Sequence, residues 1–291
     1  MLVKIFNFQS QKPGKFFYAH HVLILVMIIT SKNETCLSPT SIVSLVPSIT
    51  ELLCHLHLAD QITGVTKFCI SPAHLRSQKV MIGGTKKLDR QKVISLQPDL
   101  IIANKEENTK ADIETLAETL PVLLTDVNNL SDALEMIDSI GFLTNRIKES
   151  KQLIHNISSA FLKLQHSLAG QPKIKVLYLI WQDPFMTVGG DTFISDMLSR
   201  AGFFNSFQAD VRYPATSLAE IEIKDVDLIL LSSEPFPFSQ KHLLELQKAM
   251  PSQKFLLVDG EMFSWYGSRM LESPAYFEQL YQSASALIAL N

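Results

Sequence analysis

The chain has 291 residues, of which 46% are hydrophobic and 19% are charged, and its formal net charge is -3. These values predict one large or two ordinary globular domains with hydrophobic cores, and they argue against a disordered chain. A slightly acidic chain without a run of basic residues also argues against nucleic-acid binding, which requires clustered Lys and Arg.

Residues 1–37 resemble a leader. Three lysines precede the apolar run VLILVMII at residues 22–29, which is the order found in a secretory signal: Lys4, Lys12 and Lys15. The run is too short to span a bilayer, and the TSKNETC segment after it lacks a small-residue cleavage pattern. We expect an exported protein that is periplasmic or faces a membrane; a cytoplasmic protein with a non-working leader is the alternative.

The first predicted lobe, residues 38–142, contains three apolar strands. A strand at 42–46 is followed by Pro47 and by a helix for which Ser48 and Glu51 predict a capping box. Residues 100–103 form a continuous apolar run typical of a buried parallel strand, and the PVLLTDV segment ends at Asp126.

A long helix is predicted between the lobes, over residues 143–170. Its apolar positions recur at steps of three, four and seven, and mark one buried stripe: Ile147, Ile154, Ile157, Phe161, Leu164 and Leu168. Gly170, with Pro172 just beyond it, is typical of a helix end. Such a helix would act as a rigid strut.

The second predicted lobe, residues 171–291, repeats the order of the first. The segments KVLYLIW, DVDLILLSS and KFLLVDG predict strands, and the Gly pair of TVGGDTF predicts a turn with Asp191 or Thr192 capping the next helix. Strands that alternate with helices predict parallel sheets, so the fold class is α/β with two Rossmann-like lobes.

Ligands of open parallel sheets bind beyond the carboxyl ends of the strands. Many large aromatic side chains fall in the strand-end loops of the second lobe, which predicts a broad, rigid surface for a large and partly flat ligand. The alternative is that these aromatic residues cover the core. The candidate ligand-binding residues are Pro47, Phe68, Lys105, Glu106, Asn108, Trp181, Phe185, Met186, Tyr213, Phe236, Phe238, Glu261, Phe263, Trp265, Tyr266 and Arg269.

Signatures of catalysis and of metal binding are missing from the sequence. It has no G-x-S-x-G, H-E-x-x-H or Walker-type phosphate loop, so we expect no catalytic residues and no enzyme. His55 and His57 cannot share a helix face, and the three cysteines form no C-x-x-C pair, so we expect no metal site and buried or spare thiols. The loop carboxylates predict solvated charges, or an acid/base pair or hard-metal site if they converge: Glu106, Glu107, Asp126, Asp259 and Glu261.

The segments IVSLVPSITELL, GVTKFC, LQPDLIIANKEEN and DGEMFSWYGSR, together with the bridging helix, resemble one family over residues 40–285. It comprises the periplasmic substrate-binding proteins of ABC transporters for vitamin B12, iron-siderophore or haem ligands, and the vitamin B12 branch is the most similar. The resemblance implies a ligand cleft between the lobes and a monomer that delivers a metal chelate, cobalamin or a similar compound, to an ABC permease. It implies no covalently bound cofactor and no chemistry on the ligand.

The resemblance also implies roles for individual residues of the site. The branch holds the corrin with aromatic and Pro side chains, and the matching positions are Phe68, Met186, Tyr213 and Glu261; a Met at position 186 departs from the usual aromatic. The family docks on its permease through an exposed Glu on each lobe, and these positions fall at Gln91 and near Glu220. Because a neutral amide forms a weaker bond than a carboxylate, Asp89 is the alternative to Gln91.

Three other functions remain open. A ferric siderophore or haem calls for a cluster of cations, for which the loops offer Lys105, Arg212 and Arg269. An enzyme or a cytosolic corrinoid-handling protein could reuse the fold, with Glu106 or Glu107 meeting Asp259 or Glu261. A receptor for free metal ions is disfavoured because the chain lacks spaced histidines.

Overall fold

A computed structural model describes residues 28–29, 37–223 and 225–289. The chain forms two compact units: the first takes Met1–Asp126 and Asp138–Glu149, and the second takes Val127–Ile137 and Ser150–Asn291. The expected leader lies outside the described residues apart from Ile28–Ile29 and Leu37. No helix in the described ranges has the length and apolar character that a membrane span requires.

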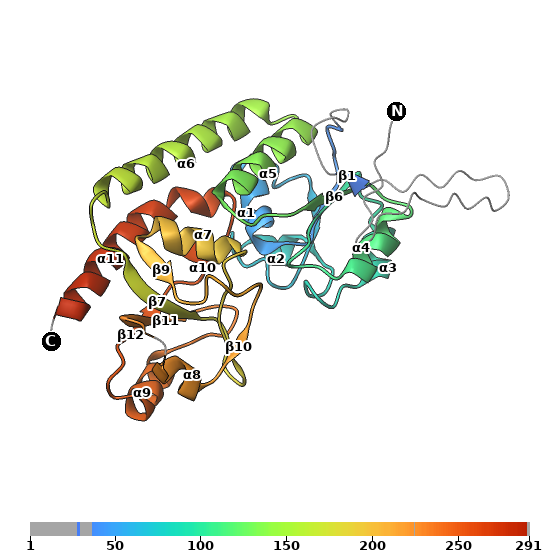
Figure 1. Ribbon diagram of the computed structural model, residues 1–291. Helices are drawn as coiled ribbons and strands as arrows, with labels where there is room; N and C mark the ends of the chain where they lie inside the picture. The colour runs from blue at the N-terminus through green and yellow to red at the C-terminus, as the bar shows by residue number, and fades with distance from the viewer. Residues whose placement is uncertain (1–27, 30–36, 224, 290–291) are drawn as a thin grey trace, which may run out of the picture. The chain divides into compact units, whose positions relative to one another are not determined.

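A six-stranded sheet forms the centre of the first unit (Figure 1). Every neighbouring pair is parallel, which confirms the predicted strands near 42, 100 and 125. Across the sheet the strands are β1 (Ile28–Ile29), β6 (Val122–Thr125), β5 (Leu100–Asn104), β2 (Ile42–Ser44), β3 (Ile62–Val65) and β4 (Val80–Met81). The side chains of β2, β5 and β6 are all buried, as expected of parallel strands covered on both faces.

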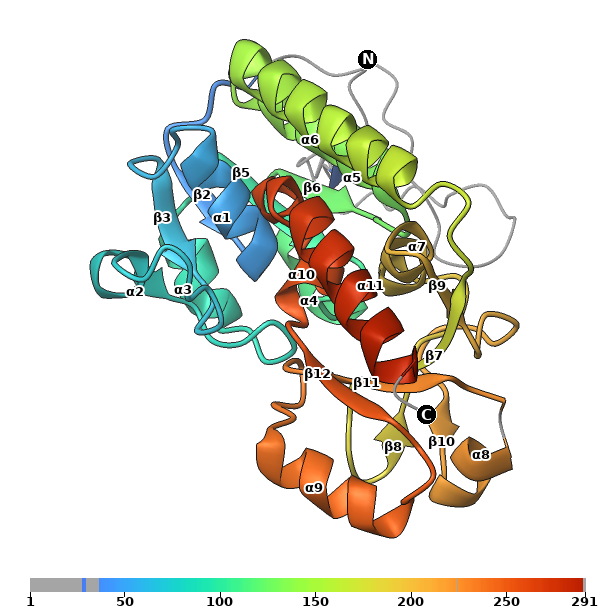
Figure 2. The same cartoon turned by 90° about the vertical axis from the view of Figure 1, so that its left-hand side faces the viewer.

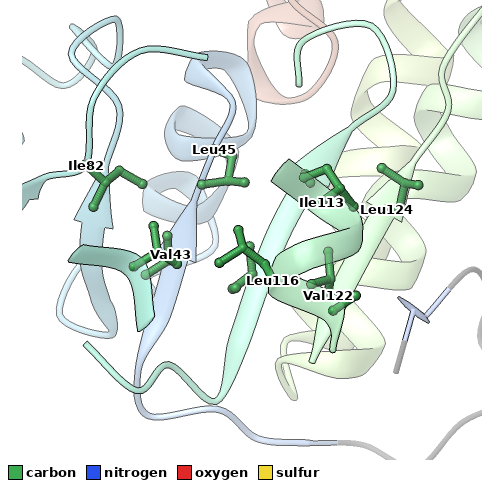
Figure 3. Close-up of a cluster of buried hydrophobic side chains, with 11 residues drawn as sticks. Val43, Leu45, Ile82, Ile113, Leu116, Val122 and Leu124 are labelled. Carbon is green, nitrogen blue, oxygen red and sulfur yellow. The ribbon is translucent and has the colours of Figure 1, made fainter. Parts of the chain in front are cut away.

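Short helices complete the first unit: α1 (Pro47–His55), α2 (Leu75–Gln78), α3 (Arg90–Ser95) and α4 (Lys110–Ala117). Figure 3 shows Ile113 and Leu116 of α4 pointing toward Val43, Leu45 and Val122 of the sheet. All five side chains are at most 3% exposed, so α4 closes one face of the sheet by burying apolar surface.

The predicted capping box at the start of α1 is wrong. Val46 occupies the N-cap position with an extended backbone and no side-chain cap, and Pro47 is the first helical residue. Proline suits this place because its fixed φ matches the helix and the N–H that it lacks would have no intrahelical acceptor. Ser48 is buried in the first turn.

Asp99 joins the chain before β2 to the chain before β5. Its Oδ2 accepts hydrogen bonds from Thr40 N at 2.8 Å, from Thr40 Oγ1 at 2.7 Å and from Ser41 N at 3.0 Å. These bonds, above all the one from the Thr40 hydroxyl, favour the carboxylate and lower the pKa of Asp99.

The lowered pKa of Asp99 gives a pH-dependent stability. The folded-state pKa lies below the unfolded value of about 3.9, so the contribution is present above that pH and is lost as the pH falls through the folded pKa. We expect Asp99→Asn to lower the free energy of unfolding at pH 7, and we expect its difference from the wild-type protein to be smaller at a pH below about 3.9, such as pH 3. Urea unfolding at both pH values measures this, and an equal difference at both would contradict it.

Two helices carry the chain between the units, α5 (Leu130–Leu143) and α6 (Ile147–Ser167). The second is the predicted long helix, and the chain after it passes Gly170 with a φ of +77°. Leu153, Ile157, Phe161 and Leu164 of α6 are buried, whereas Ile147 is 47% exposed. The predicted stripe is therefore correct in its centre and wrong at Ile147, which is the first residue of the helix.

The second unit contains a four-stranded parallel sheet, which confirms the repeated α/β plan. Its order is β12 (Phe255–Val258), β11 (Leu228–Ser232), β7 (Ile174–Leu179) and β9 (Phe203–Asn205). A separate antiparallel pair joins β8 (Phe185–Met186) to β10 (Ala215–Thr216). Because the four main strands are parallel, the loops that follow them leave the same edge of the sheet.

Helices cover both faces of this sheet. They are α7 (Phe193–Arg200), α8 (Leu218–Ile223), α9 (Gln240–Ala249), α10 (Glu261–Ser264), a 3₁₀ turn (Ser268–Leu271) and α11 (Ser273–Ala289). Figure 2 shows α7 and α11 on one side of the sheet and α8 and α9 on the other. Thr192 caps α7 by accepting a hydrogen bond from Ser195 N at 3.3 Å, which confirms one of the two predicted caps.

Candidate functional site

An aromatic platform lies at the strand ends of the second unit; it consists of Trp181, Phe236 and Phe238 from the loops and His242 from the first turn of α9. The Trp181 ring meets the edge of Phe236 at 5.8 Å between centroids, and Phe236 meets Phe238 at 4.8 Å. Phe236 N also donates to Ile180 O at 3.2 Å, which holds the loop after β11 beside the loop after β7. Trp181 is 40% exposed, so the platform offers one open aromatic surface on a fixed support.

His242 is a member of the platform that the sequence reasoning missed. Its ring centroid lies 5.2 Å from that of Phe236 and 5.8 Å from that of Phe238, and its Nδ1 accepts a hydrogen bond from Ser239 N at 3.0 Å. The signal was present as Ser239 followed three residues later by a polar residue, the spacing of a capping box.

Glu261, Trp265 and Arg269, in the segment after β12, form a second cluster. Arg269 Nη2 lies 3.3 Å from Glu261 Oε2, and the guanidinium carbon lies 5.1 Å from the Trp265 ring centroid. Trp265 is only 6% exposed, whereas the Glu261 and Arg269 side chains keep 23% and 17% of their surface. The indole ring therefore supports the charged pair, and the charged pair is more accessible to solvent than the indole.

Three of the predicted aromatic residues pack inside the second unit. Phe263 is fully buried, with ring centroids at 4.6 Å from Phe277 and 5.2 Å from Tyr178. Phe238 is 5% exposed, and Tyr266 is buried against Phe193 at 5.7 Å. For Phe263 the core alternative is correct, because a side chain without exposed surface cannot contact a ligand, and we remove it from the ligand-binding set.

The antiparallel β8 and β10 pair positions Phe185, Met186 and Tyr213. Met186 is the register partner of Ala215, and Met186 N donates to Trp181 O at 3.2 Å, so this pair adjoins the aromatic platform. Met186 and Tyr213 are half-buried, and Phe185 packs against the core of the unit. The backbone of Met186 thus lies beside that of Trp181.

Phe68 is an exposed aromatic residue of the first unit. It follows β3 and is 49% exposed, and its ring lies over Gly84, where an added Cβ would come within 3.2 Å of the ring. Lys67 Nζ lies 4.9 Å from the ring centroid. Pro47, also at the end of a strand, is half-buried as the first residue of α1.

The remaining predicted residues of the first unit have local partners. Lys105 forms an ion pair with Asp126, and Glu106 N donates to Asn104 Oδ1 at 2.8 Å. Asn108 is buried: it donates to Leu45 O at 3.3 Å and Thr85 O at 3.2 Å, and it accepts from Asn104 N at 2.9 Å. Asn108 therefore ties three strand-end segments together instead of presenting an amide to a ligand.

Removal of the Asn108 amide should destabilise the first unit. We expect Asn108→Ala to lower the free energy of unfolding by about 1–3 kcal/mol, because two buried carbonyl groups and one N–H lose their partner. The matched control is Asn156→Ala on the exposed face of α6, for which we expect a change within about 0.5 kcal/mol. Equal stability of the two variants in urea unfolding would contradict this role of Asn108.

A polar hollow of about 670 Å³ lies in the second unit and was not predicted. Its lining is Asn128, Asn129, Gly190, Asp191, Ser195, Asp196, Ser199, Gln208 and Arg212. The close approach of the backbone at residues 208–210 explains the Gly pair of the TVGG segment. A Cβ at Gly190 would lie 2.1 Å from Gln208 O, and a Cβ at Gly189 would lie 2.5 Å from Asp210 O. Asp191 Oδ1 accepts from Arg212 N at 2.6 Å, and its Oδ2 lies 3.8 Å from Arg212 Nη1.

Among the described residues of the first unit, Glu107 has a carboxyl group with a raised pKa. Loss of hydration raises the pKa of Glu107, and the nearby charge of Lys86 partly opposes the shift.

Within the described ranges, no three His, Cys, Asp or Glu side chains are grouped so that they could hold a metal ion. Cys54 and Cys69 are free thiols, half-buried and buried as expected, and burial raises the pKa of Cys54 to about 11; Cys36 lies outside the described residues.

The predicted docking residues lie on exposed helices. Gln91 is exposed on α3, next to Asp89, which caps that helix by accepting from Lys92 N at 3.1 Å. Glu220 is exposed on α8, and its Oε2 accepts from Ser217 N at 2.9 Å and from Thr216 Oγ1 at 3.1 Å. Glu220 therefore also stabilises the start of its own helix.

Comparisons with known proteins relate the whole architecture to one family. The chain is 32% identical over 179 residues to the uncharacterized ABC transporter substrate-binding lipoprotein YvrC of Bacillus subtilis, a match over 59% of this chain and 55% of that relative. It is 22% identical over 238 residues to a vitamin B12-binding protein of Pectobacterium carotovorum, over 80% of this chain and 85% of that protein.

Solved structures share the fold. The periplasmic vitamin B12-binding protein BtuF of Vibrio cholerae matches with a TM-score of 0.73 at 18% identity, over 85% of this chain and 98% of that one. A periplasmic haem-binding protein of Pseudomonas aeruginosa matches with a TM-score of 0.75 at 18% identity, over 84% and 94%. The family model described as periplasmic binding protein matches residues 42–256. With two parallel α/β units and this match over most of its length, the chain belongs to the periplasmic binding protein family.

Proposed function

We propose that the chain is the substrate-binding receptor of an ABC importer and that it captures a corrinoid of the vitamin B12 type. The observation that carries the proposal is the pair of half-exposed aromatic residues at strand ends, Phe68 in the first unit and Trp181 in the second. Each lies on a fixed support, Gly84 and Phe236 respectively. Fixed aromatic faces bind a large, flat and partly apolar ligand at low entropic cost.

The names of relatives support the same class of ligand. A protein aligned over 80% of this chain is named vitamin B12-binding, and one aligned over 59% is named an ABC transporter substrate-binding lipoprotein. We therefore propose an exported, monomeric receptor that passes its ligand, unmodified and not covalently bound, to a membrane permease. Glu220 on α8 and the Asp89–Gln91 segment at the start of α3 are the proposed contacts with the permease.

A titration with cyanocobalamin tests the proposal. Purified protein should saturate at one ligand per chain with submicromolar affinity, followed by the visible spectrum of the corrinoid and by the heat released. No binding would reject the corrinoid, and haemin would then be the next titrant because haem-binding proteins share the fold. If the protein binds haemin tightly and does not bind cyanocobalamin, the proposed receptor role stands and haem replaces the corrinoid as the proposed ligand.

A further inference from the structure

Three candidate cations of the strand-end segments are each paired with a carboxylate in their own unit. Arg269 is paired with Glu261 at 3.3 Å, Arg212 with Asp191 at 3.8 Å, and Lys105 with Asp126. Because each of these three cations is paired with one carboxylate, each pair as a whole has no net charge. An anionic ligand that approached these residues would have to compete with a carboxylate already in place.

Acidic residues outnumber basic ones at the strand ends of the second unit. The loops that follow its four parallel strands, with the short elements β8, α10 and the 3₁₀ turn that they include, span 180–192, 206–214, 233–239 and 259–272 and contain seven carboxylates and two arginines. The seven are Asp183, Asp191, Asp210, Glu234, Asp259, Glu261 and Glu272. Since these loops leave the same edge of the sheet, their excess negative charge opposes a negatively charged ligand and leaves a neutral one unaffected.

In the first unit, two lysines lie near candidate residues. Lys86 donates a hydrogen bond to Glu106 O, and its charge partly opposes the rise in the pKa of Glu107 that loss of hydration causes; Lys67 lies over the ring of Phe68. Lys67 is the cation best placed to meet a ligand on Phe68, and a single exposed ammonium contributes little in water.

We infer that Asp191 and Glu261 are selectivity residues: by neutralising Arg212 and Arg269 they restrict the site to uncharged chelates and exclude anionic ones. The inference rests on the proposed function, because it concerns the ligand of the same site. It names the substrate class as metal chelates without net negative charge, such as corrinoids whose side chains end in amides. It also gives the Glu261–Arg269–Trp265 cluster a role, because the indole keeps Arg269 in place beside its carboxylate.

Two corrinoids of the same shape test the inference. Cyanocobalamin is neutral, and its monocarboxylic acid has one side-chain amide replaced by a carboxylate. The wild-type protein should bind the acid at least about fivefold more weakly. In the double variant Asp191→Asn, Glu261→Gln the ratio of the two dissociation constants should fall by at least about fivefold, because two arginines lose their carboxylates while the new amides keep an acceptor oxygen.

The control removes the same amount of charge elsewhere in the second unit. Glu222→Gln, Glu245→Gln changes two exposed carboxylates on α8 and α9, and should leave the ratio at the wild-type value. Raising the salt from 0.1 to 1 M should shrink the wild-type ratio, since the Debye length falls from about 10 to about 3 Å. An equal shift in both double variants, or no shift in either, would overturn the inference.

Haemin, which carries two propionate carboxylates, separates this inference from the proposed function. If the wild-type protein binds no corrinoid, the proposed ligand is rejected, but the site variant should still bind haemin at least about fivefold more tightly than the wild-type and control proteins do. Equal haemin binding by all three proteins, or by none, would reject the selectivity role of Asp191 and Glu261 as well.

Discussion

Replacement of Trp181 with alanine should weaken cyanocobalamin binding at least tenfold, about 1.4 kcal/mol. Trp181 is 40% exposed, and the rest of its ring packs on Phe236, so the variant removes a ligand-facing surface with little of the core. We expect a loss of only about 0.5–1.5 kcal/mol in the free energy of unfolding, from the Trp181–Phe236 ring pair. Titration calorimetry and urea unfolding of the same preparations measure the two effects.

Phe204 provides the matched control for Trp181. It is 39% exposed in the same unit but lies on β9, outside the aromatic platform, so Phe204→Ala should leave the affinity for cyanocobalamin within about twofold. If both variants bind equally well, Trp181 is not the ligand surface. The corresponding change in the first unit, Phe68→Ala, should resemble Trp181→Ala, because Phe68 is 49% exposed above Gly84.

The largest loss of stability should come from Phe263→Ala, about 3–5 kcal/mol. Phe263 is fully buried between Phe277 of α11 and Tyr178 of β7, and no small side chain could fill the space between these rings. Thermal and urea unfolding should both show the loss, in the transition that reports the second unit. Phe263→Leu, which keeps most of the volume, should cost clearly less.

Phe263→Leu also distinguishes a packing role of Phe263 from direct contact with the ligand. If Phe263 acts only through packing, the folded fraction of Phe263→Leu should bind cyanocobalamin with an affinity close to that of the wild-type protein. A large loss of affinity at wild-type stability would contradict the core assignment. Trp265 is a comparable case: it is 6% exposed beneath Arg269, so Trp265→Ala should affect stability as well as the position of the guanidinium.

The fold could be predicted because parallel α/β units leave strong local signals. The apolar runs that became β5, β7 and β11 are continuous, since their strands are covered on both faces, and the 3.6-residue period of α6 identified the long helix. Errors occurred at element ends. The first turn of α1 begins at Pro47, and the local pattern at Ser48 and Glu51 could not show that proline already occupied the first helical position.

The candidate site was harder to predict, because similar residues at strand ends have different burial. Trp181 and Phe263 are both aromatic residues after parallel strands, yet one is 40% exposed and the other fully buried. Asn108 resembled a ligand-binding amide, but it holds Leu45 and Thr85 in place. The polar hollow was missed because its lining comes from segments that are distant in sequence, such as Asn128, Gly190 and Gln208.

The sequence by itself determined the two α/β units, their parallel strands, the long helix and the loops in which ligand-facing residues had to be sought. It could do so because periodicity and apolar runs are local and follow from backbone geometry. The tertiary structure alone decided which residues in those loops are surface and which are core. It also paired Arg269 with Glu261 and Arg212 with Asp191, because burial and ion pairing depend on contacts between segments whose distance in space the linear order does not specify.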